Sequence, residues 1–123
     1  MKEVSVILNG FRRPFALEKQ YNAVKAQSVS TKEIFLWKNH PEDNTEFDFS
    51  KYNDIAISAN NANYGVWARF AFALNATSKY ICVLDDDTIP SENWFQNCID
   101  CIEKEQDGLY GTNGIIFNDL NYV

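Results

Sequence analysis

Short β-rich runs and helical patterns alternate along this chain of 123 residues, and this alternation limits its fold more than any other feature. A strand–helix–strand order is typical of a parallel sheet with helices packed on both faces. The sequence therefore predicts one α/β domain with a mostly parallel central sheet flanked by helices. The predicted strands lie at 4–8, 33–37, 54–58, 80–84 and, as one or two further strands, 109–117; the predicted helices begin near Pro14, Trp67 and Ser91.

Local patterns support these elements. Pro14 suits the first turn of a helix, where its missing N–H costs nothing. Ser91 is expected to cap the last helix, and Gly108 to end it. The continuously apolar run 80–84 is typical of a strand buried on both faces of a sheet. The apolar helix faces are predicted at Leu17, Tyr21 and Val24, at Trp67, Phe70, Ala71 and Leu74, and at Trp94, Phe95, Cys98, Ile99 and Ile102.

Composition excludes several classes of function. Seventeen acidic residues against eleven Lys and Arg give a formal net charge of −6, so we expect no nucleic acid partner. No apolar run approaches the roughly 20 residues that span a bilayer, and no secretory signal pattern opens the chain. Three cysteines fit a reduced protein, so a cytoplasmic location is expected. The pair Cys98 and Cys101 is interpreted as helix packing and not as a metal or redox site.

The acidic run Asp85, Asp86 and Asp87 directly follows the predicted strand 80–84. Ligands bind at the carboxyl ends of strands in open parallel sheets. Two like charges about 4 Å apart repel by about 1 kcal/mol in water and about 4 kcal/mol at an effective dielectric near 20, so a cation is favoured there. If the segment is extended, Asp85 and Asp87 share one Mg²⁺ or Mn²⁺ while Asp86 faces elsewhere. A solvated acidic turn, or carboxylates that cap a helix, is the alternative.

Two other uses of such a run fit less well. An EF-hand loop needs oxygen ligands at alternating positions and a glycine sixth, and Ile89 and Pro90 break that pattern. A haloacid-dehalogenase-type phosphatase also begins with a strand and D-x-D. Here Thr88 and Ile89 depart from that motif, which leaves the phosphatase as a remote alternative.

Several further motifs stand in a fixed order around the acidic run. They are the opening strand with Asn9-Gly10-Phe11-Arg12-Arg13-Pro14, the pair Ala26-Gln27, the second strand 33–37, the segment from Asn60 through Gly65 to Arg69, and the 16-residue step from Arg69 to Asp85. In this order the chain resembles the nucleotide-sugar-dependent glycosyltransferases of the GT-A fold, particularly the family 2-like enzymes. The resemblance covers about residues 4 to 117 and implies a Rossmann-like GT-A fold.

The resemblance also implies roles for individual residues. Asp87 would bind the divalent ion, and Asp85 would reach it directly or through water while contacting the ribose. Arg69 would hold the nucleotide or order the acidic loop. Together with Asn39, discussed below, the predicted nucleotide-binding set is Asn9, Gly10, Phe11, Arg13, Asn39, Arg69, Asp85 and Asp86.

Two departures from the family pattern matter. Lys38 and Asn39 stand where the family usually has acidic residues after its second strand; Asn39 could read the edge of uracil, so uridine is expected and guanosine stays open. His40 is interpreted as a solvated side chain. Typical members also continue well beyond the length of this chain, so residues 1–123 are expected to form a single nucleotide-sugar-binding domain without the C-terminal acceptor subdomain. Asp119 is the candidate catalytic base, with a frayed polar tail as the alternative.

The sequence thus predicts a Mn²⁺- or Mg²⁺-dependent glycosyltransferase. Its donor would be a nucleoside diphosphate sugar, with a UDP-sugar favoured, and it would transfer or hydrolyse the sugar. The acceptor is unknown. A non-catalytic sugar-nucleotide-binding module, or a subunit that needs a partner for its acceptor site, is the main alternative, and a homo-oligomer could complete the cleft.

Overall fold

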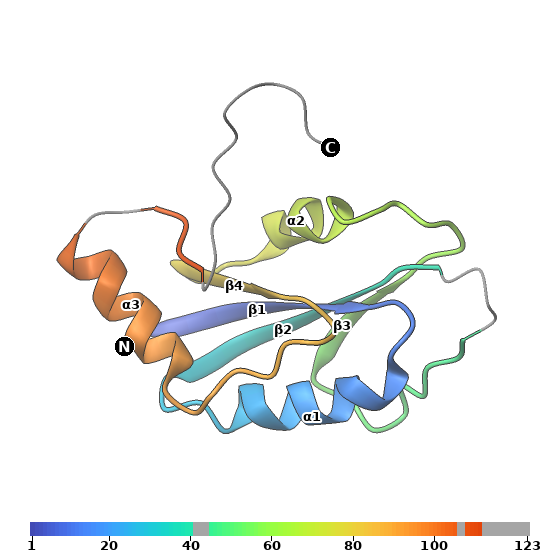
Figure 1. Cartoon of the computed structure of the whole chain (residues 1–123), viewed down its shortest axis with the longest axis horizontal. Helices are drawn as coiled ribbons and strands as arrows, with labels where there is room; N and C mark the ends of the chain where they lie inside the picture. The colour runs from blue at the N-terminus through green and yellow to red at the C-terminus, as the bar shows by residue number, and fades with distance from the viewer. Residues whose placement is uncertain (41–44, 106–107, 112–123) are drawn as a thin grey trace.

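The computed structural model describes residues 1–40, 45–105 and 108–111. Four parallel strands form one sheet in the order β3-β2-β1-β4, with helices on both faces (Figure 1). The predicted α/β class with a parallel sheet is therefore confirmed. The elements, in chain order, are β1 (Glu3–Gly10), α1 (Pro14–Lys25), β2 (Ser30–Lys38), β3 (Ile55–Ala59), α2 (Ala68–Phe72), the 3₁₀ helix η1 (Ala73–Asn75), β4 (Tyr80–Leu84) and α3 (Trp94–Lys104).

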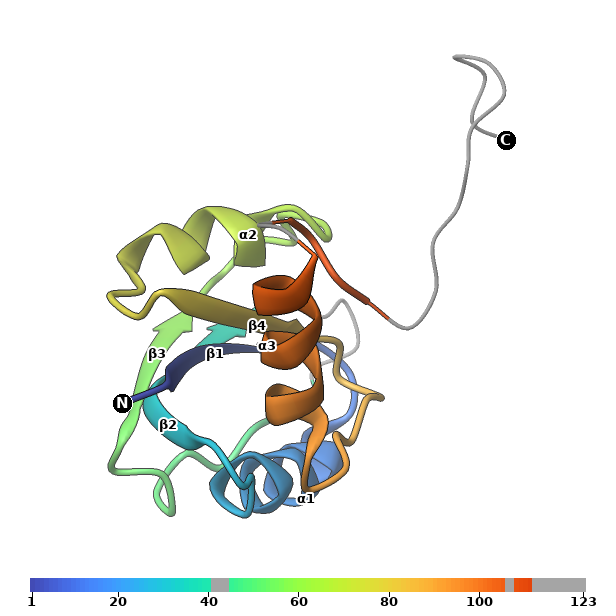
Figure 2. The same ribbon diagram turned by 90° about the vertical axis from the view of Figure 1, so that its left-hand side faces the viewer.

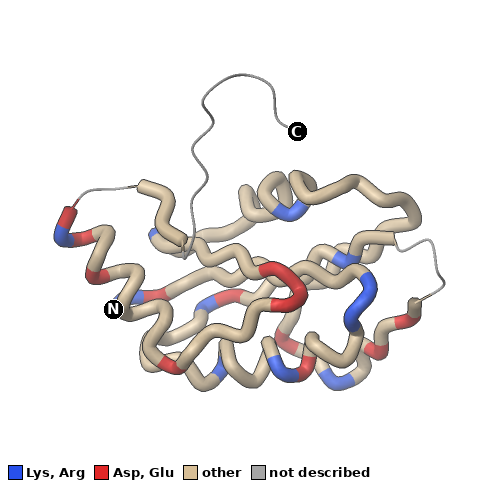
Figure 3. Tube along the Cα trace, in the orientation of Figure 1, with Lys and Arg blue, Asp and Glu red and all other residues tan. Residues whose placement is uncertain are grey.

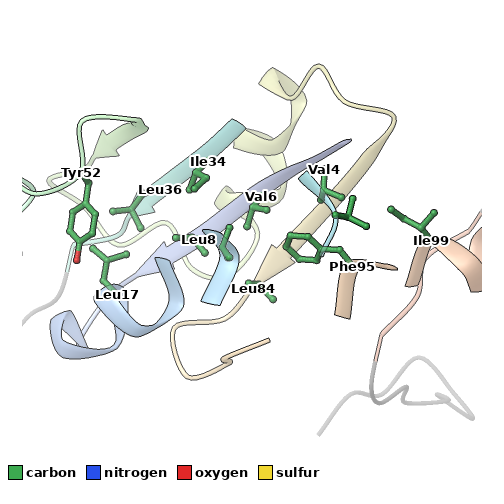
Figure 4. Close-up of a cluster of buried hydrophobic side chains, with 12 residues drawn as sticks. Val4, Val6, Leu8, Leu17, Ile34, Leu36, Tyr52, Leu84, Phe95 and Ile99 are labelled. Atoms are coloured by element: carbon green, nitrogen blue, oxygen red, sulfur yellow. The ribbon is translucent and has the colours of Figure 1, made fainter. Parts of the chain in front are cut away.

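The larger part of the core lies on the face of the sheet that α1 and α3 cover. Figure 2 shows α1 and α2 on opposite sides of the sheet. Across the strands, Leu8 of β1 is in register with Leu36 of β2 on one side and with Leu84 of β4 on the other. Leu17 from α1 and Phe95 from α3 close over this row, as Figure 4 shows. A single leucine layer thus supports the carboxyl ends of the three strands.

The opposite face has a smaller core. Ile7 and Phe35 of the sheet pack against Ala73 and the ring of Phe72. The apolar face predicted for the helix that begins near Trp67 is wrong: Trp67 and Leu74 are 77% and 87% exposed. The helical segment is short and meets the sheet through residues 69, 72 and 73, which the apolar spacing did not select.

The strand β4 is less buried than its apolar run predicts. Ile81 is 49% exposed, and Leu84 is the one residue of β4 that is buried. The reason is its position at one end of the described strand order, where β1 is its neighbour. The central strand β1 is instead the most buried, because it has a strand on each side and a core on each face.

The ends of the last helix also differ from the prediction. Asn93, not Ser91, is the N-cap of α3, and no side chain caps it; Ser91 contributes its carbonyl, which accepts a hydrogen bond from the N–H of Trp94. The helix ends at Lys104, before Gly108. Cys98 and Cys101 lie on this helix as free thiols; Cys98 is half-buried, but Cys101 is exposed, so the packing expected of the pair does not extend to Cys101. Of the predicted strand region 109–117, residues 109–111 are not in a strand and the rest lies outside the described residues.

Glu33 ties β2 to β1 and to the turn before β4, at the amino-terminal end of the sheet. Its carboxylate accepts hydrogen bonds from the Ser5 hydroxyl and from the N–H and hydroxyl of Thr77. These bonds, that from Ser5 first, lower the pKa of Glu33 below its ordinary value of 4.5. The stabilisation they give is present above that ordinary value and is lost as the pH falls through the lowered pKa.

Glu33→Gln is therefore expected to lower the melting temperature at pH 7, and the difference from the unchanged protein should shrink as the pH falls below about 4.5. Thermal unfolding at a series of pH values measures this. Glu18→Gln is the control, since the Glu18 side chain is 61% exposed and surface changes cost within about 0.5 kcal/mol. A difference that widens toward low pH would contradict the assignment.

Candidate functional site

The candidate site lies where the chain reverses its direction of travel across the sheet. From β1 the chain moves through α1 to β2 on one side, and it later returns to the other side of β1 as β4. Parallel sheets of this kind bind ligands in the crevice at the carboxyl ends of the strands beside such a switch point. Here the loop after β1 and the acidic run after β4 come together, as the neighbouring blue and red segments in Figure 3 show.

The acidic run forms a turn. The N–H of Thr88 donates to the carbonyl of Asp85 at 3.1 Å, which places Asp86 and Asp87 at the corner. The expectation that this segment is extended is therefore wrong, while the sharing of one cation by Asp85 and Asp87 stays a prediction. The reason is that β4 ends at Leu84, so the alternation of side chains stops before the first carboxylate. We call residues 85–88 the acidic turn.

Arg13 supplies positive charge to the corner of the acidic turn. One guanidinium nitrogen, Nη1, lies 3.4 Å from Oδ1 of Asp86 and 3.1 Å from Oδ2 of Asp87. The Asp86 side chain is 19% exposed and the Asp87 side chain 61% exposed. The Asp87 carboxylate is thus the more accessible of the two to a ligand from solvent.

Arg69 pairs with the remaining carboxylate of the acidic turn. Its Nη1 forms an ion pair with Oδ1 of Asp85, and the Arg69 side chain is 10% exposed. An arginine on a short helix is usually solvated, whereas this one is buried beneath the turn. The resemblance implied two roles for Arg69, to hold the nucleotide or to order the acidic loop, and the contact in the structure is of the second kind.

Gln20 holds the acidic turn from α1. Its Nε2 donates to the carbonyl of Asp85 and, at 2.7 Å, to the carbonyl of Thr88. Sequence reasoning did not select this residue, because glutamine in a helix commonly faces solvent. The available signal was its spacing from Leu17 and Val24, three residues from one and four from the other, which places it on the same face as both.

Asn39 is buried and fastens the segment after β3. Its Nδ2 donates to Oδ1 of Asn63 at 2.6 Å, and its Oδ1 accepts from the N–H of Tyr64 at 2.9 Å. Asn39 is 5% exposed. The reading of uracil by Asn39 stays a prediction, and in this structure both ends of the amide have partners inside the protein. His40 is exposed, as expected for a solvated side chain.

The end of β1 carries the remaining predicted nucleotide contacts. Asn9 and Phe11 are half-buried, and Gly10 is buried. A Cβ on Gly10 would lie 3.1 Å from the ring of Phe47, so the missing side chain makes room for that ring. The Arg12 guanidinium carbon lies 4.8 Å from the centre of the Phe11 ring, so one stacking partner of Phe11 is already in place.

A metal ion of the expected kind can be tested against the donors present. The described residues contain no group of three or more His, Cys, Asp or Glu side chains that would enclose a metal. Mg²⁺ is usually bound by one or two carboxylates together with phosphate oxygens and water, and the acidic turn offers carboxylates of that kind. The donors therefore fit a cation shared with a phosphate ligand. Asp119 lies outside the described residues.

A groove of about 950 Å³ opens on the β4 side of the acidic turn. Asp85, Thr88 and Ser91 are among its lining residues, together with apolar side chains such as Ile81 and Trp94. Within the part of the chain that the structure describes, no helix is long and apolar enough to cross a membrane.

The parallel sheet, its switch point and the acidic turn define a Rossmann-like domain of the GT-A kind. The model of glycosyl transferase family 2 matches residues 5–122, nearly the whole chain, and the chain belongs to this family. This confirms the resemblance and overrides the haloacid-dehalogenase alternative. No curated protein sequence that was compared matches the chain.

Solved structures show the same fold. The crystal structure of S. aureus TarS 1-349 superposes with a TM-score of 0.68 at 17% identity, covering 97% of this chain and 39% of that one. Its complexes with UDP and with UDP-GlcNAc each give a TM-score of 0.64 at 16% identity, covering 85% of this chain and 32% of theirs. The chain thus spans about two fifths or less of the length of these structures.

Proposed function

We propose that this chain binds a nucleoside diphosphate sugar, with UDP as the nucleotide, through Mn²⁺ or Mg²⁺ at the acidic turn, and acts in transfer of the sugar. One observation carries the proposal: three carboxylates stand at the switch point of a parallel sheet, and buried Arg69 holds the first of them. Membership of glycosyl transferase family 2 supports the class of reaction. The TarS structures with UDP and UDP-GlcNAc support the choice of nucleotide.

Each residue of the acidic turn has a distinct part in this proposal. Asp87, the most exposed carboxylate, would bind the cation, and Asp85 would reach it directly or through water. A divalent cation bound there would neutralise the diphosphate as the sugar leaves. Arg69 holds the Asp85 carboxylate in place through their ion pair.

Arg13 has a second possible partner in the diphosphate. Its guanidinium already lies beside Asp86 and Asp87, and its fork of N–H donors also matches phosphate oxygens. The Arg13 side chain is 46% exposed, so it is free to contact a ligand in the crevice while it remains near the turn. We therefore assign Arg13 to the phosphate side of the site.

Release of free UDP separates an enzyme from a binding module. The purified chain is incubated with several UDP-sugars and Mn²⁺, and free UDP is measured over time. We expect UDP release above the rate without protein, and no release when EDTA removes the cation. Binding of UDP with no release from any donor would instead identify a sugar-nucleotide-binding module.

The acceptor side of the reaction is a separate question from donor binding. If a partner must supply the acceptor site, UDP release will be slow for the chain alone and will rise when that partner is added. Binding of UDP, in contrast, requires only the residues at the switch point.

A further inference from the structure

Gln20 is a buried amide in an otherwise apolar helix face. The buried residues of α1 are Ala16, Leu17, Gln20 and Val24, and Gln20 is 1% exposed. Burial of an amide is unfavourable unless hydrogen bonds within the protein replace those made to water. An apolar residue at this position would avoid this cost. The role of Gln20 therefore lies in the hydrogen bonds that its amide makes.

Both N–H groups of that amide point at the acidic turn. Nε2 donates to the carbonyl oxygens of Asp85 and Thr88, the two residues that close the turn, and the N–H of Thr88 also donates to the carbonyl of Asp85. Gln20 therefore bridges the ends of the turn through backbone atoms. It leaves the carboxylates of Asp85, Asp86 and Asp87 free for charged partners.

A turn that carries adjacent carboxylates needs hydrogen bonds that hold its backbone in place. The adjacent carboxylates of Asp86 and Asp87 repel each other, and the Arg13 pair that offsets this repulsion is partly exposed and so weak. Hydrogen bonds from a buried side chain are less affected by solvent and by salt. They hold the backbone without removing the negative charge on which cation binding depends.

We propose that Gln20 is a positioning residue for the cation and diphosphate site. It fixes the acidic turn in the shape that presents Asp85 and Asp87 to a cation-bound diphosphate. This inference rests on the proposed function for its ligand. The hydrogen bonds from Gln20 to the acidic turn are a property of the chain, and their effect is measurable without a ligand.

The test compares Gln20→Met with Gln27→Met. Methionine keeps the length and burial of Gln20 but removes both donors. Gln27 is a matched control: its amide also donates to two carbonyls, those of Ala23 and Ser91, and accepts from the N–H of Phe95, but its hydrogen bonds do not include residues 85–88. Gln20→Ala, which has no side chain to clash, is the second variant in case methionine does not fit.

Two readouts are taken on each variant that unfolds cooperatively. Titration with UDP in Mn²⁺ should show affinity lowered about tenfold or more in both Gln20 variants, as for loss of outer-shell partners of metal ligands, and unchanged within about twofold in Gln27→Met. Hydrogen exchange of the Thr88 amide, measured by NMR without ligand, should be faster in the Gln20 variants alone.

The outcomes separate the two proposals. Wild-type affinity and unchanged Thr88 exchange in both Gln20 variants would overturn the role of Gln20. If the unchanged protein binds no UDP, the proposed function is overturned, and with it the ligand assigned to Gln20. Faster Thr88 exchange in the Gln20 variants would still confirm that Gln20 holds the acidic turn. An equal loss of UDP affinity in Gln27→Met would show that the loss follows from lowered stability in general. That result would also overturn the role of Gln20.

Discussion

Asp87→Ala is expected to lower the affinity for UDP in the presence of Mn²⁺ by about 100-fold or more. Loss of residues that only support metal ligands costs about 10–100-fold, and Asp87 is assigned as a ligand itself. Its carboxylate is 61% exposed at the corner of the acidic turn, so its removal leaves the core intact. Isothermal titration calorimetry with UDP, with and without Mn²⁺, measures the effect.

The control for Asp87→Ala is Asp100→Ala. The Asp100 side chain is also 61% exposed, but it lies on α3 and contacts Gln96 and Lys2 and no residue of the acidic turn. Its replacement is expected to leave UDP affinity unchanged within about twofold, since surface changes of about 0.5 kcal/mol or less are typical. UDP affinity that survives in Asp87→Ala would show that the assignment of the cation to this turn is wrong.

Leu8→Ala is expected to destabilise the protein by about 2–5 kcal/mol, the usual cost of a large-to-small change in a core. Leu8 is 0% exposed on the central strand, and its partners in register are Leu36 and Leu84. The cavity would open directly beneath the ends of β1 and β4. Because small domains have free energies of unfolding near 5–15 kcal/mol, this change removes a large part of the total.

Leu74→Ala is the matched control, because it makes the same chemical change at a leucine that is 87% exposed. We expect its free energy of unfolding to stay within about 0.5 kcal/mol of the unchanged protein. Urea unfolding monitored by tryptophan fluorescence measures both variants. Similar losses in the two would contradict the core described for the sheet face that α1 and α3 cover.

The fold was predictable where residue periodicity and turn residues act locally. The strands and helices of a βαβ chain alternate in the sequence itself, and Pro14 marks the start of α1 as expected. The burial of β4 was not predictable, because an apolar run does not say whether a strand is central or at an end of the strand order. Trp67 and Leu74 were misassigned to the apolar face of a helix for a related reason. Apolar spacing in the sequence does not show how short that helix is.

The site was predictable in its position and less so in its contacts. A polar run directly after an apolar strand fixes Asp85, Asp86 and Asp87 at the carboxyl edge of a parallel sheet. The shape of the acidic turn depends on Arg13 and Gln20, whose contacts with it span more than 60 residues of sequence. Such long-range pairs leave no periodic signal, which is why Gln20 was missed. Arg69 was found through the family resemblance and not through its local sequence.

Paramagnetic broadening of NMR signals by Mn²⁺ tests the central claim most directly, because it locates the cation on the chain. Mn²⁺ is added with UDP to the isotope-labelled protein, and Mg²⁺ with UDP serves as the diamagnetic reference. We expect amide signals of the acidic turn and of the loop after β1 to broaden first, and those at the amino-terminal end of the sheet, near Glu33 and Thr77, to stay sharp. Broadening elsewhere that leaves Asp85 to Thr88 sharp would contradict the account.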